Sequence, residues 1–424
     1  MKFLYDLVFI IFSILYVPYL VFKGKAHKGF LEKFGFLPEK VTRLRNPVWI
    51  HSVSVGEAVL GVKLSAYLKK CFPDRPIIVS TTTRTGYDVV SKTQNGFVDA
   101  VFYYPMDLSF ITAKVVSKIE PFAYIMIETE LWPNMLRELQ SRNIPVIMVN
   151  GRISDSSFKN YKRVKFLMTR ILKCVSCFCM QTERDAEKIA QLGASKNKIF
   201  VSGNMKFDEG LCSSGQKGIN PECFGFHDKD KVIVAGSTHF PEEIDIIDVY
   251  KDLKAERSNL RLIIAPRHVE RTSKIQNDIE KAGLNCLRFS EILKSGVHDN
   301  FSNKIILVDT IGHLADIYSV ADIVFIGGSL VKKGGQNPIE PARWGKIVIF
   351  GPNMFNFRKI TDTFLENNAA CKIRNKQELK IKIKEFLSNT RKSCEMSKNA
   401  LKVIEQNSGA IEKTVEKIKG YLTR

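Results

Sequence analysis

Acidic and basic side chains follow several apolar runs of this sequence, at positions where a strand would end. The first is Glu57, in the segment HSVSVGE at residues 51–57. Ser54 and Glu57 have the S-x-x-E spacing of a capping box, which places the carboxylate in the first turn of a helix. The helix dipole and unpaired backbone N–H groups should keep Glu57 ionised there, so it can serve as a general base. The alternative is that Glu57 only caps its helix.

Two other strand ends of the first half carry charged side chains. The segment ETELWPN (128–134) puts Glu128 and Glu130 between an apolar run and a helical pattern. Paired carboxylates suit acid–base or charge-stabilising work, and the alternative is charge at a helix N-terminus. Lys206 in GNMKFD (203–208) would neutralise a leaving phosphate, unless it is an ordinary solvated lysine.

The strand ends of the second half have the composition of anion-binding turns. They read AGSTH (235–239), APRH (265–268), DTIGH (309–313), GGSL (327–330) and GGQNPIEP (334–341). Arg267 can contact a phosphate through two N–H groups, and the glycines let backbone N–H groups approach an anion. Asn337 as N-cap and Pro338 at the first helical position predict a helix start, where Glu340 can bind ribose hydroxyls. Together these turns favour a nucleotide site.

Short apolar runs alternate with helical patterns from residue 48 onward, which indicates parallel sheets covered on both faces. The polar segment 208–230 between two such series is the best linker candidate. We therefore predict an α/β fold with two doubly wound domains facing a cleft, with ligands at the carboxyl ends of the strands. The expected strands are 48–53, 76–81, 99–103, 123–127, 146–149, 177–181 and 199–201, then 231–235, 260–265, 305–308, 322–326, 347–350 and 370–373.

Composition is that of a globular protein with an anionic partner. The 424 residues are 45% hydrophobic and carry a formal net charge of +20, which favours a phosphorylated substrate or an anionic membrane. No RNA-binding motif or finger spacing is present, so no nucleic acid partner is expected. Nine scattered cysteines predict free thiols in a reducing compartment rather than a zinc site.

Several common motifs are missing. The sequence contains no G-x-x-x-x-G-K-[ST] and no G-x-G-x-x-G after a strand, so P-loop and dinucleotide sites are not supported. Residues 228–230 (DKD) match the D-x-D form of metal-dependent glycosyltransferases. They lie in the linker candidate rather than at a strand end, so we interpret them as solvated charge and predict no metal.

The N-terminal segment is apolar. Residues 7–22 are interrupted only by Ser13 and Pro18, and a basic flank follows: Lys23, Lys25, His27, Lys28 and Lys33. No small-residue cleavage site is evident, which predicts an uncleaved anchor helix. A run of this length is short of the roughly 20 residues needed to span a bilayer, so a tilted span and an interfacial helix both remain open. The lysines place the body on the cytoplasmic side.

Taken together, these segments resemble a known family. Its members are the 3-deoxy-D-manno-octulosonic acid (Kdo) transferases, and the segments occur in the family's order. The resemblance implies a GT-B fold with two Rossmann-like domains and a membrane anchor. The anchor would span 1–22, an acceptor-binding domain 23–210 and a CMP-sugar-binding domain 211–424. The matching segments are HSVSVGE, ETELWPN, NGRIS (150–154), GNMKFD, AGSTH, PRH (266–268) and GGSL with NPIEP (337–341).

The resemblance also implies a reaction and its residues. Kdo would pass from CMP-Kdo to a lipid A precursor (lipid IVA) at the cytoplasmic face of the anionic inner membrane, in lipopolysaccharide biosynthesis, with inversion and without metal or cofactor. Glu57 would be the general base, and Glu128 and Lys206 would stabilise the transition state. The residues implied in CMP binding are Pro266, Arg267, Ile311, Gly312, His313, Asn337, Pro338, Ile339 and Glu340.

Two positions depart from the family pattern. Gln336 stands where His is usual, and His313 stands where an acidic residue is common. Both departures concern CMP contacts and leave the expected base untouched. The alternatives are another GT-B sugar-nucleotide transferase or an epimerase, and a membrane-tethered scaffold that binds nucleotides without catalysis.

Overall fold

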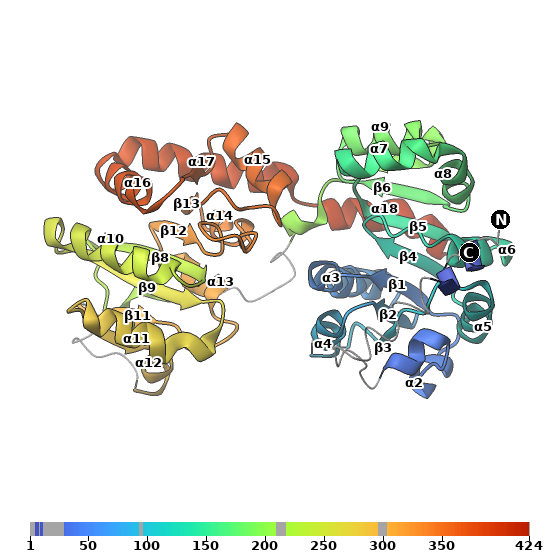
Figure 1. The fold of residues 1–424 in the computed structure, drawn as a ribbon, viewed down its shortest axis with the longest axis horizontal. Coiled ribbons are helices and arrows are strands. Elements are labelled where there is room, and N and C mark those ends of the chain that lie inside the picture. Colours follow the sequence, from blue (N-terminus) through green and yellow to red (C-terminus); the bar gives the residue numbers. More distant parts are fainter. Residues whose placement is uncertain are drawn as a thin grey trace. The chain divides into compact units, whose positions relative to one another are not determined.

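The chain forms two compact units, each built on its own parallel sheet. The computed structural model describes residues 5–7, 9–11, 29–92, 96–208, 218–295 and 303–423. The first unit comprises residues 1–208 and 408–424, and the second comprises 209–407. Figure 1 shows both units, and the sheet of each has seven strands. The predicted pair of doubly wound, Rossmann-like α/β units is confirmed.

The first sheet has the strand order β3-β2-β1-β4-β5-β6-β7. Its strands are β1 (Val48–Ser52), β2 (Ile77–Thr81), β3 (Ala100–Tyr103), β4 (Ala123–Ile127), β5 (Val146–Gly151), β6 (Cys177–Met180) and β7 (Ile199–Val201). The chain first adds strands on one side of β1 and then returns to pair β4 on its other side. Open α/β sheets bind ligands at this switch point, beyond the carboxyl ends of the strands.

Both faces of this sheet are buried, as continuous apolar strands require. Successive residues of β1 point to opposite faces, so Trp49 joins one hydrophobic cluster while Val48 and Ile50 join the other. The helices of the first unit are η1 (Phe30–Phe34), α2 (Glu39–Thr42), α3 (Val55–Cys71), α4 (Arg84–Lys92), α5 (Ser109–Ile119), α6 (Pro133–Ser141), α7 (Asp155–Arg163), α8 (Lys165–Leu172), α9 (Glu183–Gln191), η2 (Lys196–Lys198), η3 (Met205–Asp208) and α18 (Ala410–Leu422).

The final helix, α18, belongs to the first unit. The expected second domain ran to residue 424, whereas the structure places 408–424 with residues 1–208. Ile411, Val415 and Ile418 have helical spacing and pack into the cluster that contains Ile50. Without α18, the sheet face that carries Ile50 would expose apolar strand residues. Burial of the apolar side of α18 against this face explains why the helix belongs to the first unit.

The second sheet repeats the design with the order β10-β11-β9-β8-β12-β13-β14. Its switch point lies between β8 and β12, which are adjacent. Its strands are β8 (Lys231–Thr238), β9 (Leu260–Pro266), β10 (Cys286–Arg288), β11 (Ile305–Leu307), β12 (Ile323–Ile326), β13 (Ile347–Phe350) and β14 (Cys371–Lys372). The sequence missed β10, because this half-buried edge strand is only three residues long.

The helices of the second unit are η4 (Pro221–Phe224), α10 (Glu242–Glu256), η5 (Val269–Arg271), α11 (Thr272–Lys281), α12 (Phe289–Ser295), α13 (Leu314–Ile317), η7 (Tyr318–Val320), α14 (Ile339–Arg343), α15 (Arg358–Glu366), α16 (Lys376–Ser388) and α17 (Thr390–Asn407). One hydrophobic cluster joins four of them, α10, α11, α16 and α17, to the apolar strands β8, β9 and β12. The expected linker 208–230 lies partly outside the described residues.

The expected anchor, residues 1–22, lies outside the described residues except for 5–7 and 9–11, which are helical. The Asp6 carboxylate accepts hydrogen bonds from the backbone N–H (3.1 Å) and hydroxyl (2.5 Å) of Ser109 and from Nδ2 of Asn134 (2.7 Å). Asp6 therefore caps helix α5 and ties this segment to the first unit. No helix in the described part of the chain is long and apolar enough to cross a membrane.

Candidate active site

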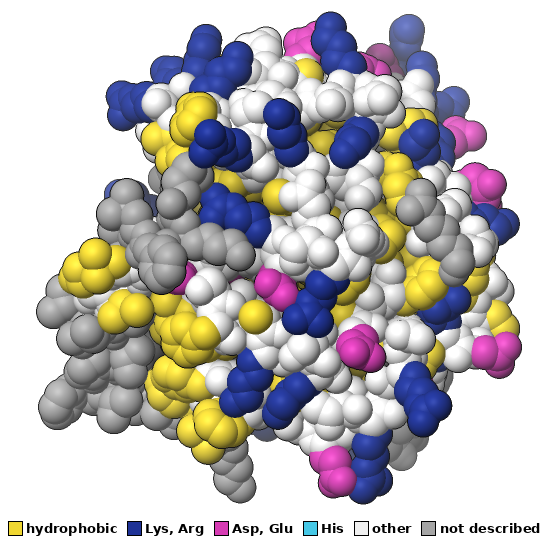
Figure 2. Space-filling model, turned by 90° about the vertical axis from the view of Figure 1, so that its right-hand side faces the viewer, with side chains coloured by type: hydrophobic (Ala, Val, Ile, Leu, Met, Phe, Trp, Pro, Cys, Tyr) yellow, Lys and Arg dark blue, Asp and Glu magenta, His cyan; other side chains and the backbone are white. Residues whose placement is uncertain are grey.

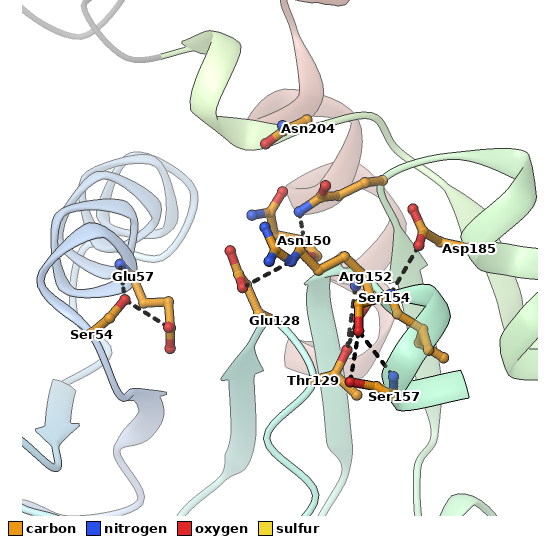
Figure 3. A network of polar contacts seen from close by, with 12 residues as sticks. Ser54, Glu57, Glu128, Thr129, Asn150, Arg152, Ser154, Ser157, Asp185 and Asn204 are labelled. Atoms are coloured by element: carbon orange, nitrogen blue, oxygen red, sulfur yellow. Dashed lines mark hydrogen bonds and ion pairs between the residues drawn. The ribbon is translucent and has the colours of Figure 1, made fainter. Parts of the chain in front are cut away.

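Glu57 lies where β1 gives way to helix α3, at the switch point of the first sheet. Ser54 is the N-cap, and its Oγ accepts from the Glu57 N–H at 3.3 Å. The Glu57 carboxylate in turn accepts from the Ser54 hydroxyl and from the Val53 N–H, both at 2.7 Å. The predicted capping box is confirmed. These bonds hold the carboxylate in one orientation (Figure 3).

Burial is the largest influence on the pKa of Glu57. Its side chain is only 7% exposed, and desolvation raises the pKa of the carboxyl above its ordinary value. Hydrogen bonds from Val53 and Ser54 oppose this shift, and the negative charge of Glu128 adds to it. Desolvation therefore opposes the ionisation that the capping hydrogen bonds favour. A pKa closer to neutrality favours a general base over a simple cap.

Glu128 follows the adjacent strand β4 and is paired with cations. Its Oε1 lies 3.2 Å from Nζ of Lys206, and its Oε2 lies 3.6 Å from Nε of Arg152. The Glu128 backbone has φ of +60°, a conformation that is uncommon for residues other than glycine and is often found at functional sites. Glu57, Glu128 and Lys206 are thus all placed at one end of the first sheet. Arg152, which sequence reasoning assigned no role, joins them.

The loops that carry Glu128 and Arg152 are bonded to each other. The Thr129 hydroxyl donates to the Arg152 carbonyl at 2.5 Å, and the Arg152 N–H donates back to Thr129 Oγ1 at 3.3 Å. Figure 3 shows this pair beside Glu128, beyond the ends of neighbouring strands. The spacing of NGRIS could have directed attention to Arg152, because it follows a strand as Glu128 does.

Lys206 is held by residues far apart in the sequence. Its short helix η3 begins at Met205, whose N–H donates to Oδ1 of the buried Asn150 at 3.0 Å. At the other end of η3, the Asp208 carboxylate accepts from the N–H groups of Gly409 (2.6 Å) and Ile411 (2.5 Å). Helix α18 therefore helps to position Lys206.

Replacing Asp208 should loosen this connection. We expect Asp208→Ala to lower the free energy of unfolding by about 2 kcal/mol, since two backbone donors lose a buried acceptor. We also expect kcat to fall, because η3 carries Lys206. Urea unfolding and steady-state kinetics measure the two effects. Asn375→Ala removes the N-cap of α16 and should cost stability without changing kcat. Unchanged values for Asp208→Ala would contradict this role.

Gly56 offers a test of whether a substrate approaches the start of α3. A Cβ atom at this helical position would meet no heavy atom within 4 Å. Alanine should therefore raise the free energy of unfolding by about 0.5–1 kcal/mol. We expect Gly56→Ala to lower kcat/KM nevertheless, because the methyl group would stand beside Glu57. A more stable variant with full activity would show that nothing needs this space.

Glu130 is the third carboxyl group of this region. Burial, with the charges of Glu57 and Glu128, raises its pKa from 4.5 to about 7. Between these pH values the folded state holds a proton that the unfolded state has lost, so stability falls as pH rises through this window. We expect Glu130→Gln to flatten this decline, as measured by urea unfolding at a series of pH values. An unchanged slope would exclude Glu130 as its source.

Close packing defines the switch point of the second sheet. A Cβ atom on Gly236 would lie 2.0 Å from the Tyr318 hydroxyl, and one on Gly327 would lie 2.3 Å from the carbonyl oxygen of Ser237. Only glycine fits at either position. The glycine of AGSTH thus makes room for Tyr318, and the first glycine of GGSL lets the end of β12 approach the end of β8.

The N–H groups of the turn after β12 already have an acceptor within the protein. The buried Glu242 carboxylate accepts from Gly328 (2.7 Å), Ser329 (3.0 Å) and Leu330 (2.9 Å), and also from His239 (2.9 Å). The expectation that this turn presents its N–H groups to a ligand anion is therefore wrong. Glu242 instead fixes the turn, and sequence reasoning missed it because the partners are 86 or more residues apart.

Positive side chains surround the end of β9. Arg267 follows Pro266, is exposed, and donates its backbone N–H to the Thr238 carbonyl at 3.0 Å. The rings of His239 and His268 lie 5.5 Å apart. Burial lowers the pKa of His239, and the nearby His268 and Lys333 lower it further. The positive charges of Arg267 and Lys333 near this turn suit an anionic ligand.

The remaining predicted CMP residues form two turns. Ile311 is 83% exposed, Gly312 has φ of +97°, and His313 is the N-cap of α13. In the other turn Asn337 Oδ1 accepts from the Ile339 N–H at 3.1 Å, and Asn337 Nδ2 donates to Glu340 at 3.4 Å. Pro338, rather than Asn337, occupies the N-cap of α14. Tyr318 packs on Gly236, and burial, with a smaller contribution from the charge of Glu340, raises the pKa of its hydroxyl.

Comparisons with known proteins agree on one family. The family model described as 3-Deoxy-D-manno-octulosonic-acid transferase (kdotransferase) matches residues 28–209. A 3-deoxy-D-manno-octulosonic acid transferase of Haemophilus influenzae is 31% identical over 396 residues, covering 93% of this chain and 91% of that protein. A bifunctional glycosyltransferase/methyltransferase of Fusobacterium nucleatum is 37% identical over 400 residues. The match covers 92% of this chain but only 60% of that longer protein.

A solved structure supports the fold. The crystal structure of a UDP-N-acetylglucosamine 2-epimerase matches 90% of this chain and 98% of that chain, with a TM-score of 0.57 and 13% identity. At this identity the likeness concerns the architecture alone, which is that of two Rossmann-like units as in GT-B glycosyltransferases.

Proposed function

Since this chain belongs to the family of 3-deoxy-D-manno-octulosonic acid (Kdo) transferases, we propose that it transfers Kdo from CMP-Kdo to lipid IVA, with inversion and without a metal. The family makes it a glycosyltransferase of lipopolysaccharide biosynthesis. One observation carries the finer proposal. The buried, hydrogen-bonded Glu57 lies on the strand end next to the Glu128–Lys206 pair, at the switch point of the first sheet.

Glu57 is the general base in this proposal. An inverting transfer needs one group that removes the proton of the acceptor hydroxyl as the new glycosidic bond forms. Burial raises the pKa of Glu57, so its carboxylate is a stronger base than a solvated glutamate. The bonds from Val53 and Ser54 keep it oriented without a water shell. General base catalysis of this kind contributes about 10²–10⁴-fold to a rate.

Fixed charges assist the departure of CMP. Glu128 and Lys206 are placed to stabilise charge that develops in the transition state. In the second unit, Arg267 is a bidentate donor suited to the monophosphate of CMP. The exposed Ile311 offers an apolar surface for the base, and Glu340 an acceptor for ribose hydroxyls. In this proposal the first unit takes the acceptor and the second takes CMP-Kdo.

The proposed acceptor places the reaction at a membrane. In this proposal the membrane lipid IVA is the acceptor, and the enzyme meets it at the cytoplasmic face of the inner membrane. The net charge of +20 supports attraction to this anionic surface.

One assay tests the proposal. The purified chain is incubated with CMP-Kdo and lipid IVA in the presence of EDTA, and the release of CMP and the mass of the lipid product are followed. We expect stoichiometric CMP and Kdo-lipid, with inverted configuration at the anomeric carbon by NMR. A requirement for added metal would overturn the metal-independent mechanism. Turnover of a UDP-sugar without transfer would instead favour an epimerase.

A further inference from the structure

The junction between helices α7 and α8 is an exposed apolar and basic tip. Helix α7 ends at Arg163 and α8 begins at Lys165, with Val164 between them. All six residues 162–167 (KRVKFL), which we call the α7–α8 tip, are exposed. The exposed fractions of Val164, Phe166 and Leu167 are 44%, 65% and 38%. Single exposed apolar residues are ordinary, but three of them within four positions indicate a contact surface.

The surroundings of the tip are strongly basic. Residues 156–173 contain six Lys or Arg and no Asp or Glu. Within the described residues, Lys162, Arg163 and Lys165 pair with no carboxylate. The guanidinium of Arg170 lies over the Phe166 ring at 4.1 Å, and Lys162 lies over the Phe158 ring at 6.0 Å. In the view of Figure 2, Lys and Arg side chains gather on the upper part of the surface, with hydrophobic side chains between them.

This combination fits the surface of an anionic bilayer. Lipid phosphates attract unpaired cations, and the acyl boundary accepts aromatic and aliphatic side chains. The aliphatic stems of lysine and arginine can lie along apolar groups while their charges remain at the headgroups. A nucleic acid or an acidic protein surface would use the cations but leave Val164, Phe166 and Leu167 without a partner.

We propose that the α7–α8 tip docks on anionic lipid, with Val164, Phe166 and Leu167 inserted below the phosphates that Lys162, Arg163 and Lys165 bind. The proposal rests on the proposed function for its purpose, which is to hold the acceptor-binding unit against the membrane that contains the acceptor. Ser154, at the other end of α7, follows the Arg152 that contacts Glu128. One nine-residue helix, about 14 Å long, therefore separates the tip from this site.

Lipid contact can be measured without donor, acceptor or turnover. Phe166→Trp in the full chain is mixed with vesicles of phosphatidylcholine and phosphatidylglycerol that carry brominated acyl chains, and the quenching above that of the wild-type chain is recorded. We expect strong quenching and a blue shift. Ile381→Trp, at an exposed apolar position of the second unit (61% exposed), is the matched control and should show neither. No quenching at position 166 would overturn the proposal.

A second variant tests the role of charge. Lys162→Gln/Lys165→Gln should weaken partitioning to the anionic vesicles about 30-fold, since each basic residue near the surface contributes about fivefold. The tip should also lose its quenching in vesicles of phosphatidylcholine alone. Equal contact with both vesicle types would exclude anionic lipid as the partner. These measurements need no catalysis. A chain that binds lipid but does not transfer Kdo would therefore contradict the proposed function and leave the docking proposal intact.

Discussion

Glu57→Gln should abolish Kdo transfer while leaving the protein folded. We expect kcat to fall by about 10²–10⁴-fold, because an amide cannot accept the proton of the acceptor hydroxyl. The amide oxygen can still accept from the Val53 N–H, as the carboxylate does at 2.7 Å, so helix α3 keeps its start. Single-turnover transfer measures the rate, calorimetry measures CMP binding, and thermal unfolding measures stability. The last two should remain those of the wild-type protein.

The capping role of Glu57 needs its own control. Ser54→Ala removes the N-cap that bonds to Glu57 and should lower the free energy of unfolding by about 1 kcal/mol. It keeps the carboxylate and should retain most of the rate. If Glu57→Gln transfers Kdo at the rate of the wild-type protein, Glu57 is a cap and not a base. If both variants lose rate equally, orientation rather than proton transfer is the limiting property.

Lys206→Met should have the second largest effect. We expect kcat to fall by about 10²–10³-fold, as is usual when one preorganised electrostatic group is removed from a transition state. Glu128, whose side chain is 16% exposed, would keep only Arg152, at 3.6 Å. Lys196→Met, in the exposed helix η2, is the matched control and should leave kcat unchanged.

The pair can be separated by a double-mutant cycle. Glu128→Gln removes the negative charge, and Lys206→Met the positive charge, of the same 3.2 Å ion pair. If the two residues act as a unit, the double variant should lose little more rate than the worse single variant. Fully additive losses would contradict a joint role. A higher KM with unchanged kcat for Lys206→Met would indicate ground-state binding instead of transition-state stabilisation.

Local sequence patterns identified the elements because those elements form through neighbours in the chain. The S-x-x-E spacing of Ser54 and Glu57 predicted the capping box, since both partners lie within one helical turn. Apolar runs predicted the strands of both sheets, because strands buried on both faces admit few polar residues. The edge strand β10 was not predicted, because its three residues are only half-buried and form no continuous apolar run.

Local sequence patterns did not predict contacts between residues far apart in the chain. The glycines of GGSL suggested free N–H donors, but Glu242 reaches that turn from 86 residues away and takes them. The resemblance implied a second domain that runs to residue 424, but α18 fills a face of the first unit, and N–H groups at its start donate to Asp208. Both outcomes depend on which surfaces meet, and sequence spacing does not encode that.

Glu57 shows the division between the two kinds of information. Sequence alone determined its place, in the first turn of a helix after an apolar strand, because capping is a local interaction. Only the tertiary structure decided its chemistry. Burial against the sheet and the charge of Glu128 on the next strand raise its pKa, while Lys206 and Arg152 arrive from other loops to pair with Glu128. Desolvation and charge act through space, so they appear only once the strands stand side by side.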